Sequence, residues 1–277
     1  MSSVSASRHH APSALGGDVR RFAELTVTIA RTDFKLRYFG SVLGYFWSLA
    51  RPLLFFGVLY VFFTQILKTG KGIPHYGVYL LTGIVLWTFF GEATGNAIAS
   101  LVAREPLLRK VRFPRLAIPL AVTLTAMFNL AMNFIAVIVF ALANGVTPRL
   151  SWLWLLPIVL GFVVISLGLA MLLSALYVRF RDIQPIWDVL SQVLFYASPI
   201  MYVAASYQGL EHLALLNPFA LMLTQMGHAF VDPALRSAYS ASGGGWHFAV
   251  SLAIIPLVLS LGLWFFTREA PYFAENL

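Results

Sequence analysis

The sequence contains no cysteine, and only 11% of its 277 residues are charged. A chain without cysteine forms no disulfide, carries no thiolate nucleophile and offers no thiolate ligand to a metal ion. Soluble domains average about 25% charged residues, so the charges here are too few to cover a soluble protein of this length. These two shortages exclude a disulfide-stabilised domain and an ordinary soluble enzyme.

Apolar residues dominate the composition instead. Hydrophobic residues make up 59% of the chain, and the mean hydropathy is +0.79. A helix that crosses a bilayer needs about 20 mainly apolar residues, and six such stretches are present. We therefore predict an all-α integral membrane protein with six transmembrane helices in a transmembrane domain over residues 45–267. The predicted spans lie near residues 45–67, 76–99, 116–143, 152–177, 183–202 and 246–266.

A seventh apolar stretch, residues 210–231, is interrupted by Asn217-Pro218 and contains Gln225 and His228. Proline disfavours a helical conformation in the residue before it and cannot continue a helix from within. We interpret this stretch as a re-entrant extracytoplasmic hairpin between spans five and six. The alternative is a full seventh span, which would put the C-terminus on the other side of the membrane.

The basic residues predict the orientation of the chain. Fifteen of the nineteen Lys and Arg residues lie in segments that a six-span arrangement puts on one side of the membrane. Cytoplasmic loops carry the excess of Lys and Arg. We therefore expect a multi-pass protein with both termini in the cytoplasm, residues 268–277 forming the C-terminal tail.

The segment before the first span divides into two parts. Residues 1–17 are polar and are expected to be a disordered cytoplasmic tail. Residues 18–44 predict an amphipathic helix lying on the inner leaflet, and a simple basic linker is the alternative. The apolar face of this helix would carry Val19, Phe22, Leu25, Ile29 and Phe34.

The motifs of several enzyme classes are missing from the sequence. It contains no phosphate-binding G-x-x-x-x-G-K-[ST], no G-x-S-x-G and no H-E-x-x-H, and no two histidines are four residues apart. We therefore expect no catalytic residue, no metal site and no cofactor bound by this chain. The basic residues follow the membrane topology, so nucleic acid is not an expected partner.

Polar residues recur inside the predicted spans at helical spacing. Glu92 is the most informative, because a carboxylate within a membrane normally faces a bundle interior, a cavity or a partner. It either lines a pathway or interface, or lies near enough to the cytoplasmic end to be hydrated or paired with a nearby Arg. The other stripes line a polar space or hydrogen-bond one helix to another. The candidate pathway residues within the spans are Glu92, Asn96, Asn129, Asn133, Asp188, Gln192, Phe195, Tyr196 and Tyr202.

The loop after the second span, residues 101–114, is basic and contains Pro106, which can begin a short helix. An amphipathic helix here would dock into a groove on a cytoplasmic partner. Anchoring of the basic residues to lipid is the alternative. The candidate coupling residues are Arg104, Glu105, Leu107, Leu108, Arg109, Lys110 and Arg112.

Several motifs resemble those of the membrane subunits of type-2 ABC exporters for polysaccharides, teichoic acids and O-antigens. The most specific is the run from Leu36 to Trp47 followed by Arg51-Pro52, which is similar to the family's R-Y-x-x-S-x-L-G-x-x-W motif before the first span. Phe39 departs from it, because the family usually carries a polar or basic residue there. The remaining matches are Lys110-Val111-Arg112-Phe113-Pro114, Arg181-Asp182-Ile183, Ser198-Pro199-Ile200-Met201-Tyr202 and Asn217-Pro218-Phe219.

The resemblance implies the permease half of an ATP-driven exporter in the bacterial inner membrane, working as a homodimer. Two copies of a separate ABC ATP-binding subunit would hold ATP and Mg. The substrate would be a glycan on polyprenyl pyrophosphate, with Arg37 and the adjacent Tyr38 at its entrance. The alternatives are an ABC exporter of small drugs or lipids and an ion-coupled carrier that uses Glu92 and Asp188 as relay groups.

Overall fold

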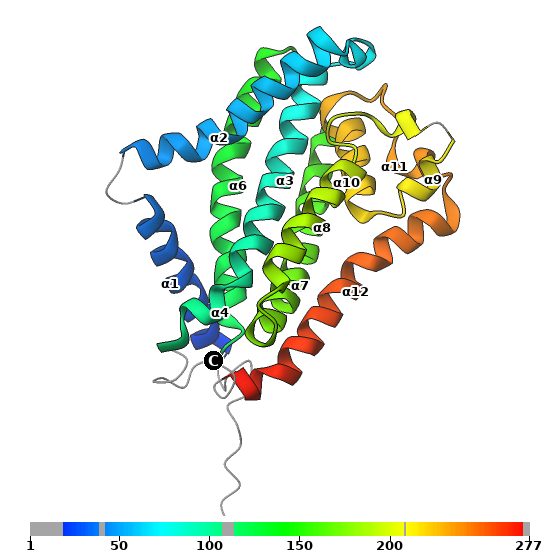
Figure 1. The fold of residues 1–277 in the computed structure, drawn as a ribbon. Helices are drawn as coiled ribbons and strands as arrows, with labels where there is room; N and C mark the ends of the chain where they lie inside the picture. Colours follow the sequence, from blue (N-terminus) through cyan, green and yellow to red (C-terminus); the bar gives the residue numbers. More distant parts are fainter. Residues whose placement is uncertain (1–18, 39–41, 107–113, 208, 274–277) are drawn as a thin grey trace, which may run out of the picture.

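The computed structural model describes residues 19–38, 42–106, 114–207 and 209–273, and these residues form helices and turns without any strand (Figure 1). Five helical segments are long and apolar enough to cross a membrane, which confirms the helical membrane class. They are Phe46–Ile66, Tyr76–Ile98, Ala117–Ala143, Leu150–Arg179 and Gly245–Tyr272.

These segments correspond to five of the six predicted spans. The first combines α2 (Val42–Val61) with a π-helical turn, η1 (Phe62–Ile66). The fourth combines the short η3 (Leu150–Trp154) with α7 (Leu155–Arg179). The others are α3 (Tyr76–Ile98), α6 (Ala117–Ala143), and α12 (Gly245–Glu269) with η6 (Ala270–Tyr272).

The predicted fifth span is shorter than expected. Its helix, α8, runs from Ile183 to Ala197 and has 15 residues, so it is about 22 Å long against a hydrocarbon core of about 30 Å. The helix ends well before the predicted Tyr202, because Ser198 takes an extended conformation. Ser198 precedes Pro199, and a residue before proline is pushed out of the helical region.

The segment between α8 and α12 contains short helices only. They are η4 (Ala204–Tyr207), α9 (Glu211–Ala214), α10 (Pro218–Met226), the π-helical turn η5 (Gly227–Val231) and α11 (Ala238–Ala241). The Asn217 side chain caps α10 by accepting a 3.0 Å hydrogen bond from Phe219 N, and Pro218 occupies the first turn. The Asn-Pro pair therefore begins a new helix, and α10 and η5 together are shorter than α8.

The predicted amphipathic segment is helical as α1 (Val19–Tyr38), and it packs against α6. Phe34 meets Phe128 of α6 edge to face at 5.6 Å, whereas Val19, expected on the same face, is exposed. The start of α1, the short α4 (Ser100–Ala103) and the end of α12 lie at one end of the bundle (Figure 1). We call this the α1 end.

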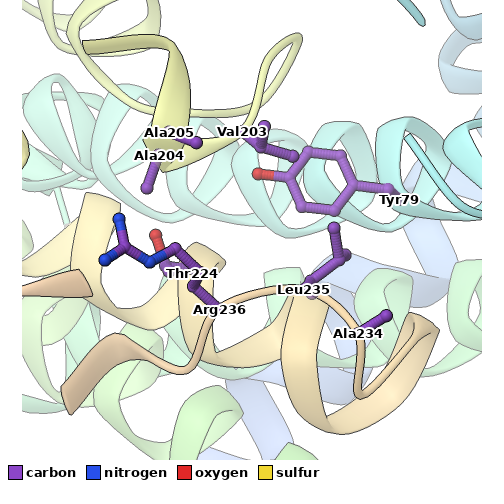
Figure 2. Close-up of a pocket in the computed structure, with 9 residues that line it drawn as sticks. Tyr79, Val203, Ala204, Ala205, Thr224, Ala234, Leu235 and Arg236 are labelled. Atoms are coloured by element: carbon purple, nitrogen blue, oxygen red, sulfur yellow. The ribbon is translucent and has the colours of Figure 1, made fainter. Parts of the chain in front are cut away.

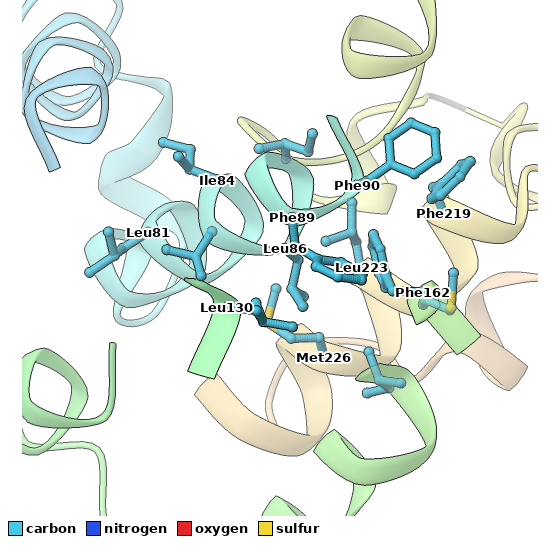
Figure 3. Packing of buried hydrophobic residues seen from close by; sticks show 14 of the residues in the cluster. Leu81, Ile84, Leu86, Phe89, Phe90, Leu130, Phe162, Phe219, Leu223 and Met226 are labelled. Atoms are coloured by element: carbon cyan, nitrogen blue, oxygen red, sulfur yellow. The ribbon is translucent and has the colours of Figure 1, made fainter. Parts of the chain in front are cut away.

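Helix α3 lies at the centre of the bundle and packs against α2, α6, α7 and α8 (Figure 1). Its buried face carries Phe90, whose ring centroid is 4.5 Å from that of Phe219 in α10. Phe219 also contacts Phe162 of α7 at 5.6 Å, and Figure 3 shows these rings packed with the leucines around them. This apolar cluster fixes α10 against the long helices.

Helices α7 and α12 cross at two glycines. A Cβ added to Gly262 would lie 2.0 Å from the carbonyl oxygen of Gly168, and one added to Gly168 would lie 2.7 Å from the backbone of Leu259. Lipid tails are as apolar as the side chains, so helices in a membrane are held by close packing, and small residues allow it. The crossing therefore depends on the absence of side chains at both positions.

We predict that Gly262→Ala lowers the thermal unfolding temperature of the purified protein, because a Cβ there overpacks the crossing at a cost of about 1–3 kcal/mol. Gly57→Ala in α2 is the matched control, since nothing lies within 4 Å of an added Cβ at that position. Equal unfolding temperatures for the two variants would contradict this account of the crossing.

Candidate functional site

Glu92 of α3 joins three helices. Asn129 of α6 donates a 2.6 Å hydrogen bond from Nδ2 to Glu92 Oε2, and Arg37 Nη1 of α1 lies 3.6 Å from the same oxygen. The side chains of Arg37 and Glu92 are 39% and 32% exposed. Glu92 therefore has the nearby arginine that one of the two sequence interpretations required.

Two further contacts attach α1 to the bundle. Asp33 forms an ion pair with Arg104, directly after α4, and the hydroxyl of Thr125 in α6 lies 3.3 Å from Ala30 O. The predicted coupling residue Arg104 is therefore bound to the same helix as the predicted pathway residue Arg37. Polar contacts at three positions along α1, namely Ala30, Asp33 and Arg37, thus hold it against α6, the residue after α4 and α3.

A groove of about 470 Å³ lies between these helices, and we call it the inner groove. Arg37 and Arg104 line it together with Asn96 and Asp33, and its apolar part includes Val122. The groove thus combines two guanidinium groups with an apolar wall.

The predicted pathway residues of α6 do not line this groove. The side chains of Asn129 and Asn133 are buried, and Asn133 donates to the backbone oxygen of Asn129 at 2.9 Å. Asn129 therefore joins α6 to α3, whereas Asn133 bonds within its own helix. Tyr38 is the last residue of α1.

The polar stripe of α8 faces away from the rest of the chain. Gln184, Asp188, Gln192 and Tyr196 are all exposed. The predicted pathway residue Phe195 is buried instead, with ring centroids 5.6 Å from Trp87 and 6.1 Å from Phe55.

A second, apolar face of α8 is also exposed in the single chain. Ile186, Val189, Leu190 and Val193 are about half exposed or more. Only Trp187 and Phe195 of this helix are buried. A helix with both a polar and an apolar exposed face has a surface that lipid alone does not suit.

Tyrosine hydroxyls hold the turn that follows α8. Tyr76 of α3 donates to Met201 O at 2.8 Å, and Tyr79, one helical turn further on, bonds to the carbonyls of Pro199 and Tyr202. These bonds satisfy backbone carbonyl groups of the turn, which lie beyond the end of α8. The sequence reasoning missed both tyrosines, although their i, i+3 spacing at the start of an apolar span was visible.

The predicted pathway residue Tyr202 takes part in the same turn. Its hydroxyl donates to Tyr196 O at 2.7 Å and lies 3.1 Å from that of Tyr207. Burial, then the hydrogen bond and charge of Tyr202, raise the pKa of the Tyr207 hydroxyl, which therefore stays protonated and donates to Ala197 O at 2.9 Å. Tyr202 is thus engaged in holding the turn.

A pocket of about 170 Å³ lies beneath this turn, between α3 and the segment after η5 (Figure 2). Tyr79 and Thr224 contribute hydroxyl groups to its wall, and Arg236 stands at one side, where it pairs with Glu211 of α9. The ion pair links α9 to the chain beyond η5, so the short helices form one connected unit.

Most of the predicted coupling helix lies outside the described residues, namely Leu107, Leu108, Arg109, Lys110 and Arg112. Glu105 is described and is half-buried. Among the described residues, no group of three or more His, Asp or Glu side chains is placed to hold a metal ion.

The apolar spans, the polar groups between them and the basic helix at one end define a multi-pass membrane protein with internal polar sites. The chain belongs to the ABC-2 type transporter family, which matches residues 24–231. This match includes α8 and the short helices that follow it, up to the end of η5.

Two relatives show how widely the similarity extends. The chain is 32% identical over 218 residues to the O-antigen export system permease protein RfbA of Klebsiella pneumoniae, which covers 78% of this chain and 83% of that protein. It is 28% identical over 224 residues to the protein of the same name from Myxococcus xanthus, covering 80% and 85%. The resemblance read from the motifs is therefore confirmed.

We predict that Arg37→Ala and Glu92→Ala are coupled in a double-mutant cycle of unfolding free energy, by about 1 kcal/mol, because the pair is only partly exposed. The exposed pair Arg20 and Glu24, whose side chains are 87% and 62% exposed, is the control and should couple by about 0.3 kcal/mol. Glu92→Gln should be milder than Glu92→Ala, since a glutamine oxygen still accepts from Asn129. Additive effects of Arg37→Ala and Glu92→Ala would contradict the pairing.

Proposed function

We propose that this chain is the permease half of an ATP-driven exporter that moves a lipid-linked polysaccharide of the O-antigen type across the bacterial inner membrane. The observation that carries the proposal is the similarity to O-antigen export permeases over about four fifths of the chain. ABC-2 family membership disfavours an ion-coupled carrier that uses Glu92 and Asp188. The chain itself breaks no bond, and a separate ATP-binding subunit, present in two copies, holds ATP and Mg.

The proposed working unit is a homodimer. The exposed apolar residues of α8 would be covered by the second copy, while the stripe of Gln184, Asp188 and Gln192 would line a water-filled path between the copies. Charged and amide groups within a membrane are found where they face such a path or a partner. The exposed ring of Tyr196 would offer a flat surface to passing sugar rings.

The inner groove is the proposed entrance for the lipid pyrophosphate. Arginine binds phosphate through paired, charge-assisted hydrogen bonds, and Arg37 and Arg104 both line the groove. Each of these arginines already pairs with a carboxylate of the chain, Glu92 and Asp33 respectively. A pyrophosphate would therefore compete with those carboxylates, and its binding would loosen the attachment of α1.

The ATP-binding subunits are proposed to act through the α1 end. There α1 and the basic segment 104–113 would contact them, and closure of the ATPase pair would move both elements. The packing of α1 against α6 and its ion pairs with Glu92 of α3 and with Arg104 after α4 connect such a movement to the transmembrane helices.

The proposal is tested by purifying this chain from native membranes in mild detergent and reconstituting what elutes in proteoliposomes. A stoichiometric ATP-binding protein and ATP-dependent movement of lipid-linked polysaccharide are expected. A chain that elutes alone and moves solute down an ion gradient would overturn the proposal. Movement of small drugs or lipids without the polysaccharide would support that alternative substrate class instead.

We predict that Leu107→Asp or Leu108→Asp leaves the protein inserted but lowers polysaccharide export per ATP hydrolysed by about tenfold, because a carboxylate in an apolar docking contact costs more than 1 kcal/mol. Leu210→Asp, at an exposed position near α9, is the control. The measurements are ATPase rate and export in the same proteoliposomes. Coupling at the unmodified level in both variants would remove the docking role.

We predict that Val193→Cys forms a covalent dimer under mild oxidation, because the proposed interface puts α8 beside its symmetry mate. The native chain has no cysteine, so any disulfide must join two copies. Leu257→Cys on α12 is the matched control, since Val193 and Leu257 are 57% and 54% exposed. Equal dimer yields on a denaturing gel would argue against α8 as the interface.

A further inference from the structure

A second groove, of about 320 Å³, lies at the end of the bundle opposite the α1 end, and we call it the outer groove. It is formed where η1, the short turn η2 (Thr69–Gly72), the start of α3 and the end of α6 meet. This region is at the top of Figure 1. Neither the inner groove nor the polar stripe of α8 contributes to it.

The outer groove is lined by polar side chains that the protein itself does not use. In the part of the chain that the structure describes, the hydroxyl of Tyr60 and the exposed side chains of Gln65 and His75 have no hydrogen-bond partner within the protein. Asn144 donates to Phe140 O at 2.8 Å, which leaves its side-chain oxygen free to accept. The groove thus presents amide, imidazole and phenol groups together, with no carboxylate among its lining residues.

An aromatic wall is built into the same groove. The rings of Tyr60 and Tyr76 stack with centroids 6.3 Å apart and planes 22° apart. A Cβ at Gly77 would lie 3.2 Å from the Tyr60 ring, and one at Gly70 would lie 2.7 Å from the Tyr76 ring. Both rings therefore pack against backbone at glycine positions, and Tyr60 remains 39% exposed.

The backbone places one of the polar groups. His75 is in the left-handed conformation, with φ 46° and ψ 40°, directly before α3. This conformation is uncommon for a residue with a side chain and carries a free-energy cost of about 1 kcal/mol or more. The stacked Tyr76 next to it and the helix that follows hold His75 in this position, with its imidazole on the groove.

We propose that the outer groove binds a sugar unit of the polymer as it leaves the transporter, an inference that rests on the proposed export function. Sugars combine hydroxyl groups that exchange hydrogen bonds with amide and imidazole groups and ring faces that pack on aromatic side chains. The absence of carboxylates from the lining suits a neutral or an acidic sugar. The groove lies at the end of the bundle opposite the α1 end, where the lipid would enter. It would therefore contact the polymer on the exit side.

The test measures binding of polysaccharide to the permease with its ATP-binding subunit in nanodiscs. The probe is the water-soluble polysaccharide released by mild acid from the envelope of the organism that carries the gene. Gln65→Ala and His75→Asn should each weaken binding at least fivefold without lowering the unfolding temperature. Asparagine also tolerates the left-handed conformation, so His75→Asn removes the imidazole and keeps the backbone. Tyr60→Leu should weaken binding similarly.

Tyr239→Leu is the control, because Tyr239 is an exposed tyrosine, 61% exposed, that lies outside the outer groove. Binding within twofold of the unmodified protein in both Gln65→Ala and His75→Asn would overturn the inference, as would an unmodified complex that binds no polysaccharide. ATP-driven export is measured on the same preparations. If the unmodified complex exports polymer while the groove variants bind normally, only this inference fails; if it exports none, the proposed function fails as well.

Discussion

The pairing of polar groups within an apolar bundle is the constraint on which the rest of this structure depends. A polar group left unpaired in hydrocarbon costs several kcal/mol, and the central helix α3 carries such groups at both ends. Toward one end, Glu92 accepts a hydrogen bond from Asn129 and pairs with Arg37. At the other end, the hydroxyls of Tyr76 and Tyr79 donate to backbone carbonyls. These contacts add specific positions to α1 and to the turn after α8, both of which also pack through apolar residues such as Phe34 and Ile200.

Because α3 is a continuous, largely buried helix, it connects those two regions as one rigid element. Packed helices shift as units rather than bend. A displacement of α1 through the Arg37–Glu92 pair therefore acts on a helix whose other end holds the turn after α8. The two ion pairs of α1 are partly exposed, so they are weak enough to exchange partners, whereas the buried tyrosine contacts are not. The proposed sites of substrate entrance and exit accordingly differ in how firmly they are held.

The same constraint is not met along α8. Gln184, Asp188 and Gln192 remain exposed beside exposed apolar residues, and a membrane offers no partner for them. The crossing of α7 and α12 shows the contrasting case, in which Gly168 and Gly262 let two helices meet at backbone distance within one chain. The exposed polar and apolar residues of α8 are therefore the physical argument for the proposed second copy at that helix.

The sequence by itself determined the membrane class, five of the spans, the amphipathic helix α1 and the break at Asn217-Pro218, because length, hydropathy, periodicity and proline act locally. The family was also readable, since its motifs are short and contiguous. Only the tertiary structure decided that Asp33 meets Arg104, that Tyr79 holds the turn at Pro199, and that Phe195 is buried while Tyr196 is not. Those outcomes depend on how far each helix is rotated and shifted along its axis relative to its neighbours. Hydrophobic periodicity marks the apolar side of a helix, but it does not say which residue of another helix lies opposite.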